Sequence, residues 1–173
     1  MYNGSKDTFW EVVMLKIKKG SSAILSLILA YVALAVVAAV AVAIPFLNKF
    51  LYDHFFIGKL NDGGVIGFVA LFYLALVPVA VADILLIRLL GNVRRAEVFT
   101  SSAVSKLRGI SWCCFAECLI LLCGGIGFYK LFILPHAFLI VAFVAAFLGI
   151  VLRVVKNVIE EATAIKSEND YTI

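Results

Sequence analysis

The chain has 173 residues, of which 64% are hydrophobic and 15% are charged, and its formal net charge is +4. Soluble domains contain about 45–50% apolar and about 25% charged residues, and a protein of this size has too much surface to bury so large an apolar fraction. We therefore exclude a soluble globular protein and predict a single membrane domain over residues 1–173, with the lipid bilayer as its main solvent.

Four stretches are long and apolar enough to cross a bilayer as helices, which takes about 20 residues each. They cover residues 22–44, 64–89, 109–129 and 133–152. Their faces are apolar all round, and backbone groups in lipid find no water to bond. The sequence therefore predicts an all-α, integral membrane four-helix bundle. The first stretch exceeds the core of about 7–15 residues typical of a signal peptide, so we expect it to stay uncleaved.

The segment before the first span is predicted to be helical, and the segment after it is predicted to be a loop. Residues 5–20 have a helical pattern, with Phe9, Val13 and Ile17 on one face. This pattern suits either a helix lying at the headgroup boundary or a cytoplasmic extension of the first span. From Pro45 to Gly63 the sequence predicts an aromatic outer loop.

The middle connection, Leu89–Arg108, contains a start signal for the third helix. Thr100 is a good N-cap, and Phe99 and Val104 have the spacing of a hydrophobic staple around it. We expect the helix that begins there to continue as the third span. The turn between the third and fourth spans is very short, which predicts that those two helices are antiparallel neighbours.

The fourth span is expected to continue as a cytoplasmic helical tail over residues 153–168. Apolar residues recur there at helical spacing, between charged ones, and we call them the tail stripe: Val151, Val155, Val158, Ala162 and Ile165. Such a stripe needs a cover. The middle connection, the N-terminal helix, a second copy of the chain or another protein are the alternatives.

The Lys and Arg residues fall mostly on one side of the predicted spans. The chain has 15 of them. Twelve lie in the N-terminal segment, the middle connection and the tail: Lys6, Lys16, Lys18, Lys19, Arg88, Arg94, Arg95, Lys106, Arg108, Arg153, Lys156 and Lys166. The other three are Lys49, Lys59 and Lys130. Cytoplasmic loops are enriched in Lys and Arg, so we predict that both termini are cytoplasmic.

Two acids within the spans, Asp83 and Glu117, form the candidate polar site. Asp at the centre of a membrane helix costs about 2.5–3.5 kcal/mol on insertion scales, and such residues are often functional. A rise of 1.5 Å per residue places both acids at a similar depth, about 8–11 Å from the cytoplasmic ends. Arg88 is badly placed on its own helix to pair with Asp83, so Arg153 or Arg108 is the expected partner. The alternatives are a proton or cation path, a buried switch, or the favoured structural ion pair or packing contact.

Other residue patterns carry weaker signals. Four cysteines lie in the third span, Cys113, Cys114, Cys118 and Cys123, where their spacing fits a metal or redox site badly and packing well. Small residues at spacing four, such as Ala35, Ala39 and Ala43, let helices approach closely. We expect them to pack the bundle rather than a dimer, although a homo-oligomer stays open. We predict no metal, no cofactor, no catalytic residues and no direct nucleic-acid binding.

Two segments resemble the bacterial membrane family catalogued as Domain of Unknown Function 2975. One is Phe99-Thr100, Val104, Leu107-Arg108 and Ile110-Ser111-Trp112; the other is Ile159-Glu160-Glu161-Ala162, Ile165-Lys166 and Glu168-Asn169-Asp170-Tyr171-Thr172-Ile173. The resemblance covers nearly the whole chain, although Tyr171 stands where leucine is usual. Genes of this family often lie beside a gene for a small helix-turn-helix DNA-binding regulator, and the family has no established activity.

The resemblance implies a non-enzymatic regulatory or accessory protein of the bacterial plasma membrane, working with a cytoplasmic helix-turn-helix regulator. The expected partner-contact tail consists of Ile165, Glu168, Asn169, Asp170, Tyr171, Thr172 and Ile173. The alternative function is a small transporter or an ion-conducting subunit that uses the intramembrane acids. An enzyme is the least favoured reading, because no acid–base or nucleophile constellation converges.

Overall fold

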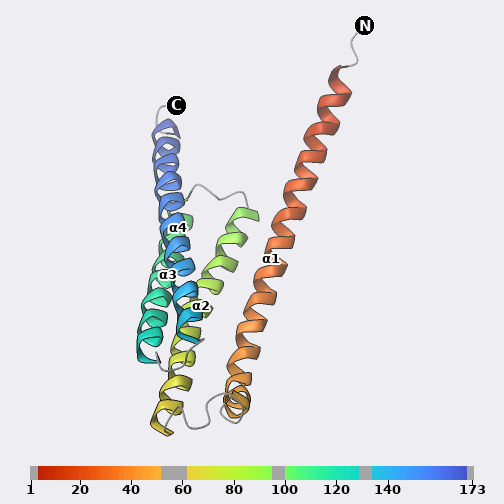
Figure 1. Ribbon diagram of the computed structural model, residues 1–173. Helices are drawn as coiled ribbons and strands as arrows, with labels where there is room; N and C mark the ends of the chain where they lie inside the picture. The colour runs from red at the N-terminus through yellow and green to blue at the C-terminus, as the bar shows by residue number, and fades with distance from the viewer. Residues whose placement is uncertain (1–3, 52–61, 95–99, 129–133, 171–173) are drawn as a thin grey trace.

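The computed structural model describes the chain as four α-helices and the residues that flank them. Residues 4–51, 62–94, 100–128 and 134–170 are described. The helices are α1 (Gly4–Leu51), α2 (Asp62–Arg94), α3 (Ser101–Gly127) and α4 (Leu134–Asp170) (Figure 1). Each has the length and the apolar composition needed to cross a membrane, which confirms the all-α prediction with four spans and suggests a multi-pass membrane protein.

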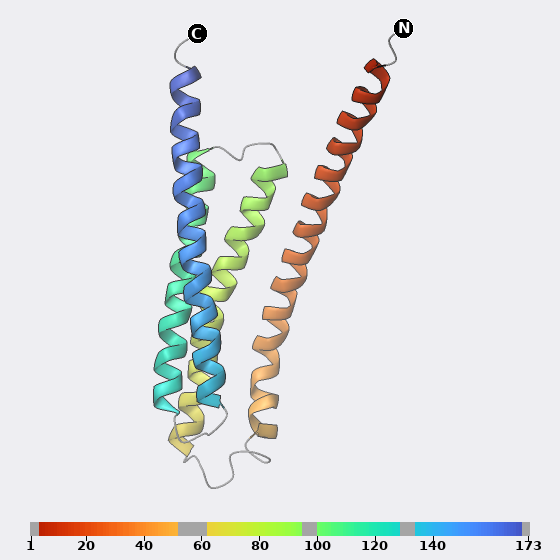
Figure 2. The same cartoon turned by 45° about the horizontal axis from the view of Figure 1, so that its top comes forward.

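Helices that follow one another along the chain lie side by side. Extensive contacts join α1 to α2, α2 to α3, and α3 to α4, and α3 and α4 are antiparallel as predicted. Figures 1 and 2 show that α1 leans away from the other helices toward its N-terminus. The bundle is therefore an open row rather than a closed ring, with a gap on the side between α1 and α4.

Helix α1 extends further than the sequence patterns alone indicated. α1 is one unbroken helix from Gly4, which agrees with the alternative of an extended first span. The outer loop predicted from Pro45 was wrong in its start, because α1 continues through Pro45 to Leu51. Proline inside a membrane helix removes one backbone hydrogen bond and bends the helix without ending it. Figure 1 shows the last turns of α1 pointing away from its main axis.

The start of α3 is fixed by the predicted cap. Thr100 has extended dihedral angles, φ −136° and ψ 150°, and its side-chain oxygen accepts a hydrogen bond from the backbone N–H of Ala103 at 3.3 Å. The bond satisfies one of the amides that a helix start leaves free. Phe99, the other half of the predicted staple, lies outside the described residues. At the other end, α4 runs without a break to Asp170, which confirms a helical tail.

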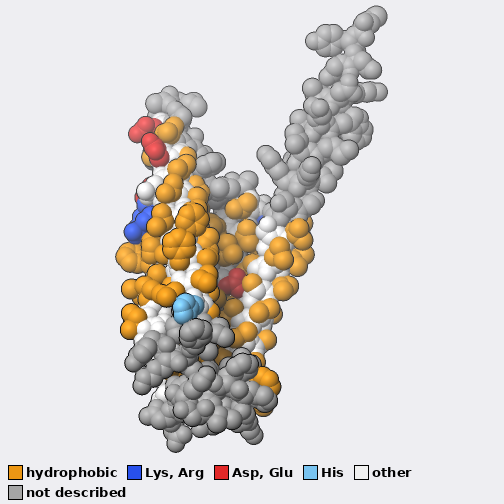
Figure 3. All heavy atoms as spheres, viewed as in Figure 1, with side chains coloured by type: hydrophobic (Ala, Val, Ile, Leu, Met, Phe, Trp, Pro, Cys, Tyr) orange, Lys and Arg blue, Asp and Glu red, His pale blue; other side chains and the backbone are white. Residues whose placement is uncertain are grey.

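The best-buried apolar cluster joins α2, α3 and α4. It consists of Phe68, Leu121, Phe138 and Ala142, each no more than 8% exposed. Edge-to-face contacts of aromatic rings surround it, with Phe68 lying 4.9 Å from Phe72 between ring centres. Outside this cluster the large side chains mostly point outward, and Figure 3 shows hydrophobic atoms covering the visible helix faces. A surface of this kind is suited to lipid.

A close approach of α3 to α4 is built around a glycine. The buried Ser111 hydroxyl donates a hydrogen bond of 2.9 Å to the backbone carbonyl of Gly149. A Cβ atom at Gly149 would lie 3.3 Å from Cys114 Cβ and from two ring atoms of Phe115. The absence of a side chain at Gly149 therefore allows the two helices to approach closely.

Small residues at spacing four on α1 do not contribute to this packing. Ala35, Ala39 and Ala43 are exposed, so our expectation that they pack the bundle was wrong for α1. Ala142 on α4 is 1% exposed and does pack against the core.

Candidate functional site

A cleft of about 320 Å³ lies where all four helices meet, and it contains both intramembrane acids. We call it the acidic cleft. Its lining residues are Ala33 and Val37 of α1, Pro78, Val79, Ala82, Asp83 and Leu86 of α2, Ile110, Cys113, Cys114 and Glu117 of α3, and Ala145 and Leu148 of α4. The sequence had placed the two acids at a similar depth, and the structure brings them to the walls of one cleft.

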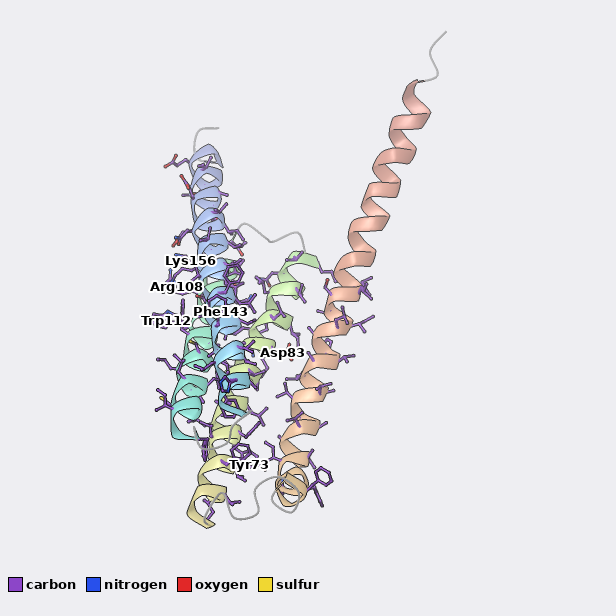
Figure 4. The ribbon with its side chains drawn as sticks, in the orientation of Figure 1. Tyr73, Asp83, Arg108, Trp112, Phe143 and Lys156 are labelled. Carbon is purple, nitrogen blue, oxygen red and sulfur yellow. The ribbon has the colours of Figure 1, made fainter. Side chains whose placement is uncertain are left out.

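The acids are held in this cleft with unsatisfied oxygen atoms. Asp83 is 8% exposed, and its buried Oδ2 atom has no hydrogen-bond partner among the described residues. Glu117 is half-buried, and its buried Oε2 atom likewise has no partner in the described part of the chain. Figure 4 shows Asp83 between α2 and α1. A buried polar atom without a partner is costly and rare in folded proteins, so these two atoms mark the strongest local conflict in the described part of the chain.

A second apolar cavity of about 340 Å³ adjoins the acidic cleft. Val79 and Glu117 line both, so Glu117 stands at their boundary. The rest of its lining is apolar: Val40, Leu71, Phe72, Ala75, Leu76, Leu121, Ala137, Phe138 and Val141. The two cavities are therefore mainly apolar, with Asp83 in the wall of the acidic cleft and Glu117 in the walls of both.

The arginines expected to neutralise the acids lie elsewhere. The Arg153 guanidinium lies over the ring of Trp112, 5.1 Å from its centre, and also faces Phe115 at 5.7 Å. Arg108 lies 3.6 Å from Glu160. In Figure 4, Arg108 and Trp112 are on the side of α3 and α4 that faces away from α1.

The predicted pairing of Asp83 or Glu117 with an arginine is therefore not found among the described residues. Arg88 is exposed and does not line the acidic cleft. The contact that sequence reasoning missed is the cation–π contact of Arg153. Aromatic residues three positions apart on α3, Trp112 and Phe115, were the signal that could have indicated it.

The cysteines do not form a metal centre in the part of the chain that the structure describes. No group of three or more His, Cys, Asp or Glu side chains there could hold a metal ion. Cys113 and Cys114 line the acidic cleft, and Cys118 packs against the core cluster. All four cysteines are free thiols.

The first turns of α3 and the C-terminal part of α4 form a second polar region. Glu160 contacts both Arg108 of α3 and Lys156 of its own helix. Beside these charges lies a groove of about 380 Å³ lined by Ser101, Val104, Ser105, Arg108, Glu160, Thr163, Ala164 and Ser167. The α3 start thus contacts one face of the α4 tail.

The residues of the tail stripe do not line this groove. Val151, Val155, Val158 and Ile165 are between 40% and 61% exposed, whereas Ala162 is half-buried. Of the predicted partner-contact residues, Glu168 is exposed. The side chains of Asn169 and Asp170, and residues 171–173, lie outside what the structure describes. No described part of the chain covers the exposed stripe residues.

The segments that carried the family resemblance meet in space. Leu107 and Ser111 of the first segment are buried, and Arg108 binds Glu160 of the second. A family model described as "Protein of unknown function (DUF2975)" matches residues 42–173. No curated protein and no solved structure matches the chain. Because the match spans most of the sequence, the chain belongs to this family of unknown function.

Proposed function

We propose that the protein is a non-enzymatic regulatory or accessory protein of the bacterial plasma membrane, with both termini in the cytoplasm, that binds a cytoplasmic helix-turn-helix regulator. The exposed stripe on the α4 tail is the observation that carries this proposal. The excess of Lys and Arg at the termini and in the middle connection supports the orientation.

The length of α4 supports a projection into the cytoplasm. At 1.5 Å per residue its 37 residues span about 55 Å, against about 30 Å for the hydrocarbon core. The ion pair of Glu160 with Arg108 joins the projecting part to α3, so the tail is a supported helix rather than an isolated one. Val155, Val158 and Ile165 then present an apolar face outside the bilayer, and such faces mark contact surfaces for proteins.

The partner class comes from the family resemblance. Members are often encoded beside a small helix-turn-helix regulator, and an apolar helical face is a suitable surface for the helices of such a protein. Binding at the membrane would hold the regulator away from DNA, and a signal would release the regulator.

The test measures binding of the purified regulator encoded beside the gene to the full chain in lipid nanodiscs. Replacing Val155, Val158 and Ile165 together by Ser is expected to abolish binding, and deletion of residues 167–173 to weaken it. Asn157→Ser, a change at an exposed position on the same tail, is the matched control and should bind normally. Equal binding by all variants, or a neighbouring gene of another kind, would refute the partnership.

The orientation has a separate test. A tag fused after Ile173 is expected to be protected in intact cells and to become accessible only after the membrane is broken. Labelling from outside would contradict the proposed orientation.

A second candidate is a small transporter or ion-conducting subunit, favoured by the presence of Asp83 and Glu117 in one cleft. Asp83→Asn and Glu117→Gln should then change an ion- or pH-dependent phenotype while membrane abundance stays constant. If neither change has this effect, the transport function is rejected.

A further inference from the structure

We propose that the acidic cleft is a binding site for a lipophilic organic cation, such as a quaternary ammonium or phosphonium compound. The proposal concerns binding alone, and it stands whether or not the protein contacts a regulator or moves its ligand. It is carried by three features of the cleft: its charge, its walls and its access.

The two acids of the cleft have no cationic side chain beside them among the described residues that line it. Asp83, which lines the cleft, is 8% exposed. Its buried Oδ2 atom has no hydrogen-bond partner among the described residues. Glu117 contributes a second unpartnered oxygen. No Lys, Arg or His is among the residues that line the cleft. A bound cation would supply the positive charge that the described residues do not, and opposite charges attract strongly where water is excluded.

The walls of the cleft select an organic cation over a metal ion. Apart from the two acids and two cysteines, every lining side chain is an aliphatic residue or proline. No group of three or more His, Cys, Asp or Glu side chains in the described part of the chain is placed to hold a metal ion. Apolar walls with one or two charged groups are instead typical of sites for small organic molecules.

The size and position of the cleft admit such a ligand. Its volume of about 320 Å³, with the adjoining cavity of about 340 Å³ at Glu117, lies in the range of about 300–1,000 Å³ found for ligand sites. Figure 3 shows acidic atoms recessed between the hydrophobic surfaces of α1 and the other helices. The open side of the helix row therefore gives a lipophilic ligand a path from the bilayer to the acids.

The experiment measures equilibrium binding of radiolabelled tetraphenylphosphonium to the full chain in nanodiscs of neutral lipid. Unlabelled tetraphenylphosphonium is the competitor, and triphenylphosphine oxide, which has a similar shape and no net charge, is the matched control. We expect saturable cation binding that triphenylphosphine oxide does not displace. Asp83→Asn and Glu117→Gln should each weaken binding at least tenfold, the double variant should abolish saturable binding, and Asp83→Glu should retain it. Glu161→Gln, an exposed acid outside the cleft, should bind normally.

A second pair of variants tests the location without changing an acid. Ala33→Phe adds a ring at the cleft wall on α1, whereas Ala35→Phe adds the same ring to the same helix at a position outside the lining. Ala33→Phe should weaken binding and Ala35→Phe should not, with circular dichroism and gel filtration showing that both fold. The proposal is overturned if the wild type shows no saturable binding, if the double acid variant binds as well as the wild type, or if triphenylphosphine oxide competes as well as unlabelled tetraphenylphosphonium.

Discussion

The contact between α3 and α4 at Gly149 gives a prediction whose size follows from the distances around it. An alanine Cβ at Gly149 would lie 3.3 Å from Cys114 Cβ and from the Phe115 ring, which is closer than ordinary van der Waals contact, so these neighbours on α3 must move by a few tenths of an ångström. Overpacking of this kind costs about 1–3 kcal/mol. The shift also lengthens the 2.9 Å bond from Ser111, and membrane hydrogen bonds of this type contribute about 0.6 kcal/mol on average.

The matched control is Gly91→Ala in α2, where an added Cβ meets no atom within 4 Å. Alanine is favoured over glycine inside a helix by about 1 kcal/mol, and this gain is common to both variants and cancels in their difference. We expect Gly149→Ala to have a free energy of unfolding about 1–3 kcal/mol below that of Gly91→Ala. Unfolding by sodium dodecyl sulfate in mixed micelles, followed by far-ultraviolet circular dichroism, measures this difference. Equal stability of the two variants would refute the close approach of α3 and α4.

Two more predictions concern charged groups. In a Trp10→Phe background, Arg153→Gln should change the emission of Trp112 and lower stability by about 0.5–1 kcal/mol, since the cation over the ring is lost; unchanged emission would contradict the contact. Arg108→Gln should cause a small loss of stability, because both partners in its pair with Glu160 are about half exposed. That loss should vanish in about 1 M salt, where the Debye length falls to about 3 Å. A loss that persists at high salt would show that Arg108 acts otherwise.

Sequence reasoning succeeded where the cause is local. Hydrophobic length identified the four spans, because a bilayer imposes a minimum length on each helix. The N-cap at Thr100 depends on one side chain and the amide three residues later. The similar depth of Asp83 and Glu117 followed from the helical rise alone.

It failed where the answer depends on how the helices are rotated about their axes. The faces of α3 that meet α4 are set by Ser111 and Gly149, and a glycine pattern does not tell which neighbour approaches it. That rotation places Arg153 over Trp112 and away from both acids. In uniformly apolar spans the usual amphipathic signal for the buried face is missing, so this contact could not be read from periodicity.

The row arrangement of the helices has a consequence for how the protein is made. Because the extensive contacts join helices that follow one another along the chain, most contacts link segments that leave the ribosome in succession, and the contact order of the fold is low. Each helix inserted after α1 finds a packing partner already in the bilayer. Biogenesis can thus proceed in the direction of synthesis.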